Sequence, residues 1–142
     1  MSALRKKRET SPGRVLLAYD GSEEARRGLE LAGAMAGPGG KITVVNVIPV
    51  HGVGARLETV SEEEGSEQQR LLREARGLLA RKGVHADLVE GVGDPFTEIL
   101  AAAAAVDAGT IVIGQGPRRL PLRLSVSERL VRRATCDVLV VH

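Results

Sequence analysis

The sequence has 142 residues, of which 43% are apolar and 27% are charged, and its 20 basic and 18 acidic residues give a net charge of +2. This composition excludes a generally disordered chain, and no apolar run approaches the ~18 residues that a membrane-spanning helix requires. The near balance of charge provides no bulk attraction to nucleic acid or to an anionic membrane. A chain of this length is expected to fold as one domain around one core.

The cysteine and aromatic content excludes further classes of protein. Cys136 is the single cysteine, so the chain cannot form an internal disulfide or a cysteine-rich zinc site. The N-terminus lacks the apolar core of a secretion signal, and we therefore expect a cytoplasmic protein. Tyr19 and Phe96 are the only aromatic residues, which leaves no base-stacking surface for a single-stranded nucleic acid. We expect neither a nucleic-acid partner nor a membrane partner.

The chain begins with a basic segment that has no apolar periodicity. Residues 1–13 contain four consecutive basic residues and end in a chain-breaking Ser-Pro-Gly sequence. We interpret residues 1–13 as a basic flexible tail and residues 14–142 as the folded domain. A nucleic-acid-binding arm is the weaker alternative, because the run has only four basic residues.

Strand and helix patterns then alternate along the first half of the domain. The apolar run 15–18 predicts a strand, and apolar residues spaced by four, three and four from Ala25 to Ala36 predict a helix that Ser22 caps. The β-branched run 42–48 predicts a second strand. Residues 50–58 are expected to form a loop. A capping-box sequence at 61–64 then begins a helix that ends at Gly83.

The second half continues the same alternation. Residues 84–89 mix apolar and polar side chains, as is typical of an edge strand. Asp94 and Pro95 predict a helix start, with Asp94 as the cap. The uninterrupted apolar run 110–113 predicts a strand covered on both faces. A helix at about 126–134 precedes the last strand, from Val138 to Val141.

This order predicts an α/β domain with a doubly wound, five-stranded parallel sheet and helices on both faces. Ligands of such sheets bind beyond the carboxyl ends of the strands, where the strand order reverses. The segments that follow Ala18, Ile48, Val89 and Ile113 are therefore the places in which to search for a site.

The first candidate site residue is Asp20, which follows the first strand directly. A carboxylate at this edge of the sheet can accept hydrogen bonds from a ribose hydroxyl or an amine. The alternative is that Asp20 and Ser22 only shape a turn and cap a helix.

The second candidate is the segment from Gly114 to Ser127. Gly114 and Gly116 follow the buried fourth strand and permit a close approach of the backbone to an anion, while Ser125 and Ser127 begin the last helix. Arginines at positions 118, 119 and 123 could add charge-assisted hydrogen bonds. The alternative is a loop with solvated arginines and helix-capping serines.

Other kinds of site are not supported by the residues. The three histidines are far apart in sequence, and Cys136 is better explained as a small buried side chain than as a nucleophile. The sequence has neither a Gly-x-Gly-x-x-Gly motif after the first strand nor a Walker lysine motif, and it lacks the acidic pair of a phospho-receiver domain. We predict no catalytic residue and no metal ligand.

Three motifs in the same order resemble those of the universal stress protein family. They are the sequence from Val15 to Ser22, the Gly-Asp-Pro sequence at 93–95, and the segment from Ser125 through Val141. The resemblance covers residues 14–142. It implies an adenine nucleotide alpha hydrolase-like fold, a homodimer formed through the last strand, and in many members a site for ATP, with Mg²⁺.

The resemblance also implies roles for individual residues. Asp20 would contact the ribose and the adenine, and Val47 would present backbone groups to the edge of the adenine. Gly114, Gly116, Ser125 and Ser127 would line the phosphates. The remaining residues assigned to the nucleotide site are Ala18, Ile113, Val126, Arg118 and Arg119.

The sequence departs from the family's ATP-binding pattern in one loop. The pattern has two residues between its first and second glycines and nine residues between its second and third glycines, and serine or threonine follows the third. In this sequence one residue separates Gly114 from Gly116, and eight residues separate Gly116 from Ser125. The loop is thus shorter by three residues, and Leu124 stands where the third glycine is expected. A Cβ at that position disfavours left-handed backbone angles by about 1 kcal/mol or more.

The function expected from these residues is that of a regulatory or sensor protein that binds an adenine nucleotide without catalysis. The alternative is a dimeric protein-interaction module of the same family that binds no nucleotide and uses the arginines of 118–133 to contact an acidic partner. Slow ATP hydrolysis is the least favoured function, because no residue is evident that would activate water.

Overall fold

The computed structural model describes residues 14–50, 60–116 and 125–142. The predicted tail at 1–13 and most of the loop predicted at 50–58 lie outside these residues. The described elements, in chain order, are β1 (Val15–Ala18), α2 (Glu23–Ala36), β2 (Lys41–Pro49), α3 (Glu62–Ala80), β3 (His85–Gly93), α4 (Pro95–Val106), β4 (Thr110–Gly114), α5 (Val126–Arg133) and β5 (Asp137–Val141).

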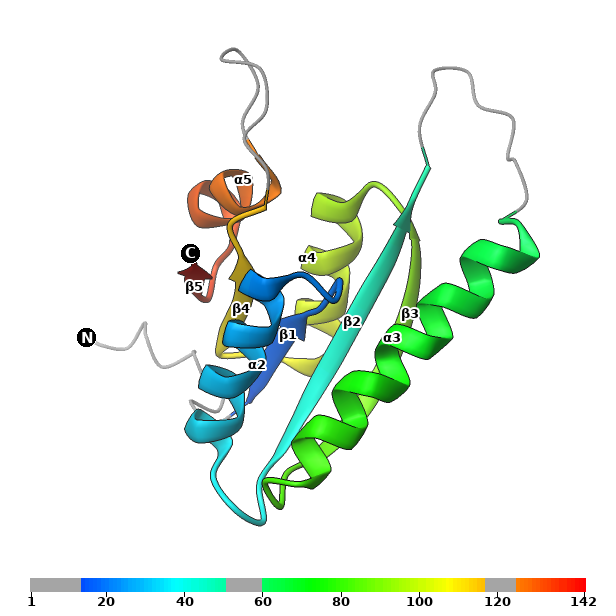
Figure 1. The fold of residues 1–142 in the computed structure, drawn as a ribbon. Helices are drawn as coiled ribbons and strands as arrows, with labels where there is room; N and C mark the ends of the chain where they lie inside the picture. The colour runs from blue at the N-terminus through cyan, green and yellow to red at the C-terminus, as the bar shows by residue number, and fades with distance from the viewer. Residues whose placement is uncertain (1–13, 51–59, 117–124) are drawn as a thin grey trace.

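All five strands join one parallel sheet in the order β3-β2-β1-β4-β5. Helices α2 and α3 cover one face of this sheet, and α4 and α5 cover the other (Figure 1). The prediction of a doubly wound, five-stranded parallel sheet is therefore confirmed. The strand order reverses between β1 and β4, which lie side by side at the centre.

The central strand β1 connects two hydrophobic cores. Leu17 belongs to the core beneath α2 and α3, whereas Leu16 belongs to the core beneath α4 and α5. Both side chains are fully buried. Successive side chains of a strand point to opposite faces, so a continuous apolar run is what a strand covered on both faces requires.

Side-chain caps begin the described helices, as the sequence predicts. The Ser22 hydroxyl accepts a hydrogen bond from the backbone N–H of Ala25 at 3.1 Å, and the Asp94 carboxylate accepts one from that of Thr97 at 3.0 Å. Ser61 and Ser125 each form a complete capping box with the glutamate three residues later. Such caps contribute about 1 kcal/mol each and fix the residue at which each helix starts.

Strand β3 is longer than the sequence predicts. It is an edge strand, as expected, but it continues from the predicted end at Val89 to Gly93 and pairs with β2 along its whole length. The extension includes Gly91, where an added Cβ would lie 3.2 Å from a Val47 methyl group. Glycine, commonly a turn residue, here permits close packing between two strands.

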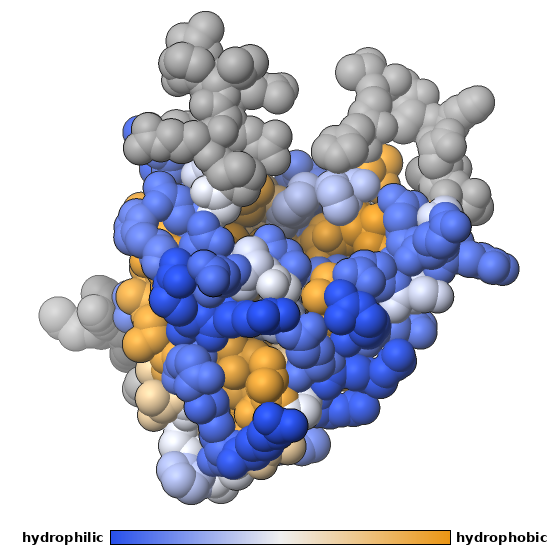
Figure 2. Space-filling view, viewed as in Figure 1, coloured by the Kyte–Doolittle hydropathy of each residue, from blue (hydrophilic) through white to orange (hydrophobic). Residues whose placement is uncertain are grey.

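The outer faces of α2 and α3 are mostly hydrophilic (Figure 2). This distribution is expected of amphipathic helices whose apolar stripes pack on a sheet. Within the described part of the chain, no helix has the length and apolar character needed to cross a membrane.

Candidate functional site

A pocket of about 210 Å³ lies at the carboxyl ends of the central strands. Its walls come from the ends of β1, β2 and β4 and from the starts of α2, α4 and α5. It therefore opens where the strand order reverses, which is the position that the topology predicts for a ligand site.

The structure brings nine of the predicted site residues together around this pocket. They are Ala18, Asp20, Val47, Ile113, Gly114, Gly116, Ser125, Val126 and Ser127. Arg118, Arg119 and Leu124 lie outside the described residues. Seven further residues line the pocket and were not predicted from the sequence as site residues; they are Tyr19, Ser22, Val45, Asn46, Pro95, Ile99 and Gln115.

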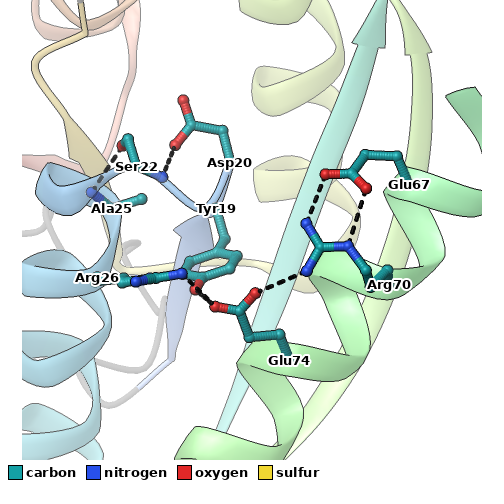
Figure 3. Close-up of polar contacts among 8 residues, drawn as sticks. All are labelled: Tyr19, Asp20, Ser22, Ala25, Arg26, Glu67, Arg70 and Glu74. Carbon is teal, nitrogen blue, oxygen red and sulfur yellow. Dashed lines mark hydrogen bonds and ion pairs between the residues drawn. The ribbon is translucent and has the colours of Figure 1, made fainter.

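Asp20 provides an exposed carboxylate at the edge of the pocket. Its Oδ1 atom accepts a hydrogen bond from the backbone N–H of Ser22 at 3.0 Å (Figure 3). The Ser22 hydroxyl in turn caps α2. The turn thus uses one carboxylate oxygen, and Oδ2 has the acceptor capacity that a ribose hydroxyl requires. The turn-and-cap role and a binding role are compatible at this residue.

Tyr19 anchors the Asp20 turn to the α2 and α3 face of the sheet. Its side chain is buried, and its hydroxyl donates a hydrogen bond to Glu74 Oε2 of α3 at 2.8 Å. The same oxygen accepts from Arg26 of α2 at 3.0 Å, and Arg70 reaches Glu74 Oε1 at 3.5 Å (Figure 3). Tyr19 therefore links β1 to both helices on this face of the sheet.

The start of α5 forms the opposite end of the pocket. The capping box uses the backbone N–H groups of Ser125 and Glu128. Because first-turn N–H groups have no acceptor within a helix, those of Val126 and Ser127 can bind an anion. The buried hydroxyl of Ser127 lies 3.1 Å from that of Ser125 and donates to the Gln115 carbonyl at 3.3 Å.

Three helix starts contribute to the same pocket. Ser22 caps α2, Pro95 begins α4 and Ser125 caps α5, and all three residues line the pocket. Each helix N-terminus carries a partial positive charge that favours an anion. Their convergence favours a negatively charged ligand in this pocket.

An apolar slot lies between β2 and α4. Val45 and Val47 of β2, Pro95 and Ile99 of α4 and Ile113 of β4 line this part of the pocket. A slot of this kind suits a flat apolar ring, because burying apolar surface is favourable and a few polar groups at its rim fix the orientation.

Glycine is required for different structural reasons at Gly114, the last residue of β4, and at Gly116. A Cβ at Gly114 would lie 2.8 Å from the Glu24 Cβ atom, so Gly114 allows α2 to pack closely on the end of β4. Gly116 has φ +74°, a left-handed conformation that glycine adopts without steric cost. The anion-binding role predicted for both glycines stays a prediction.

Arg129 braces α5 against α4 beside the pocket. Its guanidinium carbon lies 4.1 Å from the centre of the Phe96 ring, and its Nη1 atom lies 3.9 Å from Asp94 Oδ1. Hydrogen bonds from the Thr97 hydroxyl and backbone, together with the charge of Arg129, lower the pKa of Asp94. These contacts join α5 to the start of α4 beside the pocket.

Among the residues that the structure describes, no group of three histidine, cysteine, aspartate or glutamate side chains could hold a metal ion. Cys136 is half-buried, less than predicted, and packs against the core beneath α4 and α5.

The chain is similar to universal stress proteins in both sequence and structure. The universal stress protein family model matches residues 12–142. A universal stress protein of Methanocaldococcus jannaschii is 33% identical over 140 residues, which cover 90% of this chain and 81% of that protein. The structure of a universal stress protein from Archaeoglobus fulgidus matches with a TM-score of 0.71 at 26% identity, over 91% of this chain and 93% of that chain. A universal stress protein in complex with cAMP matches with a TM-score of 0.69, also at 26% identity, over 91% of this chain and 96% of that chain.

The ionisation of Tyr19 tests the anchor beneath the Asp20 turn. Burial, and next the hydrogen bond to Glu74, raise the pKa of Tyr19 above its ordinary value of 10.0, although Arg26 opposes this shift. The chain has one tyrosine and no tryptophan, so phenolate absorbance reports this residue alone. We expect a titration midpoint above 10 in the folded protein and a lower midpoint in Glu74→Gln.

Glu67→Gln is the matched control, because Glu67 pairs with Arg70 and makes no contact with Tyr19. Since the folded-state pKa is raised, the stability linked to Tyr19 is fully present below pH 10 and is lost as the pH rises through the folded-state pKa. A midpoint at or below 10 in the folded protein would show that the phenol is not held as described.

Proposed function

The chain belongs to the universal stress protein family, and on that premise we propose that it is a regulatory or sensor protein that binds an adenine nucleotide without catalysis. The observation that carries the proposal is the pocket at the reversal of strand order. Its walls combine an apolar slot, a carboxylate and three helix starts, and they surround a volume of about 210 Å³. The related universal stress protein in complex with cAMP supports the same ligand class.

We assign each part of the pocket to one part of an adenine nucleotide. The slot between Val47 and Ile99 would hold the base, with the backbone of Val47 at its edge. Asp20 would accept hydrogen bonds from the ribose hydroxyls. The phosphate would lie at the start of α5, against Ser127 and the backbone N–H groups of its first turn.

The proposal includes ATP with Mg²⁺ among the nucleotides. Arg118 and Arg119 would contact the further phosphates, and their part in binding is a prediction from the sequence alone. Guanidinium groups suit this role because they form charge-assisted hydrogen bonds with phosphate. Comparing adenosine, AMP and MgATP in one calorimetric series ranks the contribution of each phosphate.

The absence of catalysis is part of the proposal for a chemical reason. Nucleotide hydrolysis needs a group that orients or activates water. The described hydroxyls at the phosphate end, Ser125 and Ser127, are hydrogen-bonded to each other and to the main chain. Asp20 lies at the end of the pocket that we assign to the ribose.

We also propose the cytoplasm as the location of the protein.

Asp20→Ala tests the proposed function. We expect AMP affinity, measured by calorimetry, to fall by about 10- to 100-fold, because a hydrogen bond to a charged group contributes about 1.5–3 kcal/mol. Asp20→Asn keeps an acceptor for the Ser22 N–H group and removes the charge. A loss of AMP affinity in this variant would therefore report the loss of the charge and not a change in the turn. Glu63→Ala removes an exposed carboxylate that does not line the pocket and should leave affinity unchanged.

Two results would contradict this function. One is that the unmodified protein releases no heat and shows no rise in melting temperature at millimolar AMP or MgATP. The other is that AMP binds equally well to the protein with and without Asp20. Dimerisation in the absence of nucleotide binding would favour a protein-interaction module.

We also propose a homodimer formed through the last strand, Val138 to Val141. Strand β5 is an edge of the sheet, and Leu139 on this edge is 37% exposed. Val131 of α5, on the other face, is also exposed. An edge strand with apolar side chains presents unpaired backbone groups, which a second copy can pair with.

Sedimentation or non-denaturing mass spectrometry tests this interface. We expect a dimer for the unmodified protein and a shift toward monomer for Leu139→Glu, because the charge would be buried without a partner. Val92→Glu is the matched control, since Val92 is 44% exposed on the opposite edge strand β3. Dissociation by the control substitution alone would place the interface on β3 instead.

A further inference from the structure

Two buried amide side chains, one of which lines the pocket and one of which does not, are not used in the function proposed above. Asn46 of β2 is 9% exposed and Gln68 of α3 is 4% exposed. Buried amides are costly unless their hydrogen-bonding groups have partners. The partners of these two show what the amides hold in place.

The two amides form a continuous chain of hydrogen bonds from α3 to the end of β1. Gln68 Nε2 donates to the main-chain carbonyls of Asn46 at 2.8 Å and Gly91 at 2.9 Å, and lies 3.2 Å from Asn46 Oδ1. Asn46 Nδ2 then donates to the Tyr19 carbonyl at 2.8 Å. Gln68 thereby joins β2 to β3, and Asn46 joins β2 to β1.

The last bond in this chain acts on the residue before Asp20. The Tyr19 carbonyl belongs to the peptide unit that also contains the Asp20 N–H group, and a peptide unit is planar. A hydrogen bond that fixes this carbonyl therefore fixes the orientation from which the Asp20 backbone continues. The Tyr19 N–H group is held separately by the Val45 carbonyl at 2.9 Å.

We propose that Asn46 and Gln68 are positioning residues, which hold the Tyr19 carbonyl and thereby orient the Asp20 carboxylate toward the nucleotide. This inference rests on the proposed function. Gln68 does not line the pocket, so any effect of its substitution on affinity must act through other residues. Asn46 lines the pocket and transmits the constraint to Tyr19.

A double-mutant cycle between Gln68 and Asp20 tests the proposal. Gln68→Met keeps a long side chain and removes both donors, and Gln69→Met, at the adjacent exposed position, is the matched control. We expect Gln68→Met to weaken AMP binding about tenfold when Asp20 is present, because groups that act through one another are coupled in such cycles. In the Asp20→Ala background we expect Gln68→Met to cause little further loss.

An equal loss in both backgrounds would overturn the proposal, since Gln68 would then act independently of Asp20. No loss in either background would overturn it as well. If Gln68→Met does not fold, Gln68→Leu provides the same cycle, because leucine also lacks a hydrogen-bond donor and position 68 does not line the pocket.

Hydrogen exchange at the Ser22 amide provides a readout that needs no nucleotide. This amide donates to Asp20 Oδ1, so its protection reports the orientation of the carboxylate. We expect faster exchange in Gln68→Met and unchanged exchange in Gln69→Met. If the unmodified protein binds no AMP, the proposed function fails, whereas unchanged Ser22 exchange in Gln68→Met would overturn the positioning role.

Discussion

The structure depends on one topological constraint, the reversal of strand order on the two sides of β1. Right-handed crossovers place α2 and α3 on one face of the sheet and α4 and α5 on the other. Because all strands are parallel, every crossover helix starts at the same edge of the sheet. At the reversal the loops diverge, and the space between them is the pocket. The apolar run of β1, buried on both faces, makes this arrangement stable.

The fold could be predicted from the sequence because its signals are local. Ser22, Asp94 and the two capping boxes mark helix starts through contacts within four residues, and apolar runs mark the strands. Strand β3 was predicted too short because its extension depends on pairing with β2, a contact between distant residues. The positions of Asp20 and Ser127 beside the pocket could be predicted because each lies next to an element boundary at the carboxyl edge of the sheet, where ligands of such sheets bind.

The rest of the pocket could not be predicted because its residues meet only after folding. Pro95 and Ile99 were visible as a helix start and an apolar position, but nothing local indicates that they face β2 across a slot. Asn46 gave a signal, since a polar side chain interrupts a β-branched run. Its partner Gln68 lies 22 residues away on a helix whose sequence shows only an amphipathic pattern.

Adenine nucleotide binding at the reversal of strand order is the central proposal for this protein. The most direct measurement is an NMR titration of the isotope-labelled protein with AMP, followed at every backbone amide. We expect saturable shifts concentrated at Asp20, Val47, Gly114 and Ser127, with little change along the β3 edge. Nucleotide binding at this pocket would be ruled out if no amide shifted at millimolar AMP, or if the shifts gathered on a surface away from these four residues.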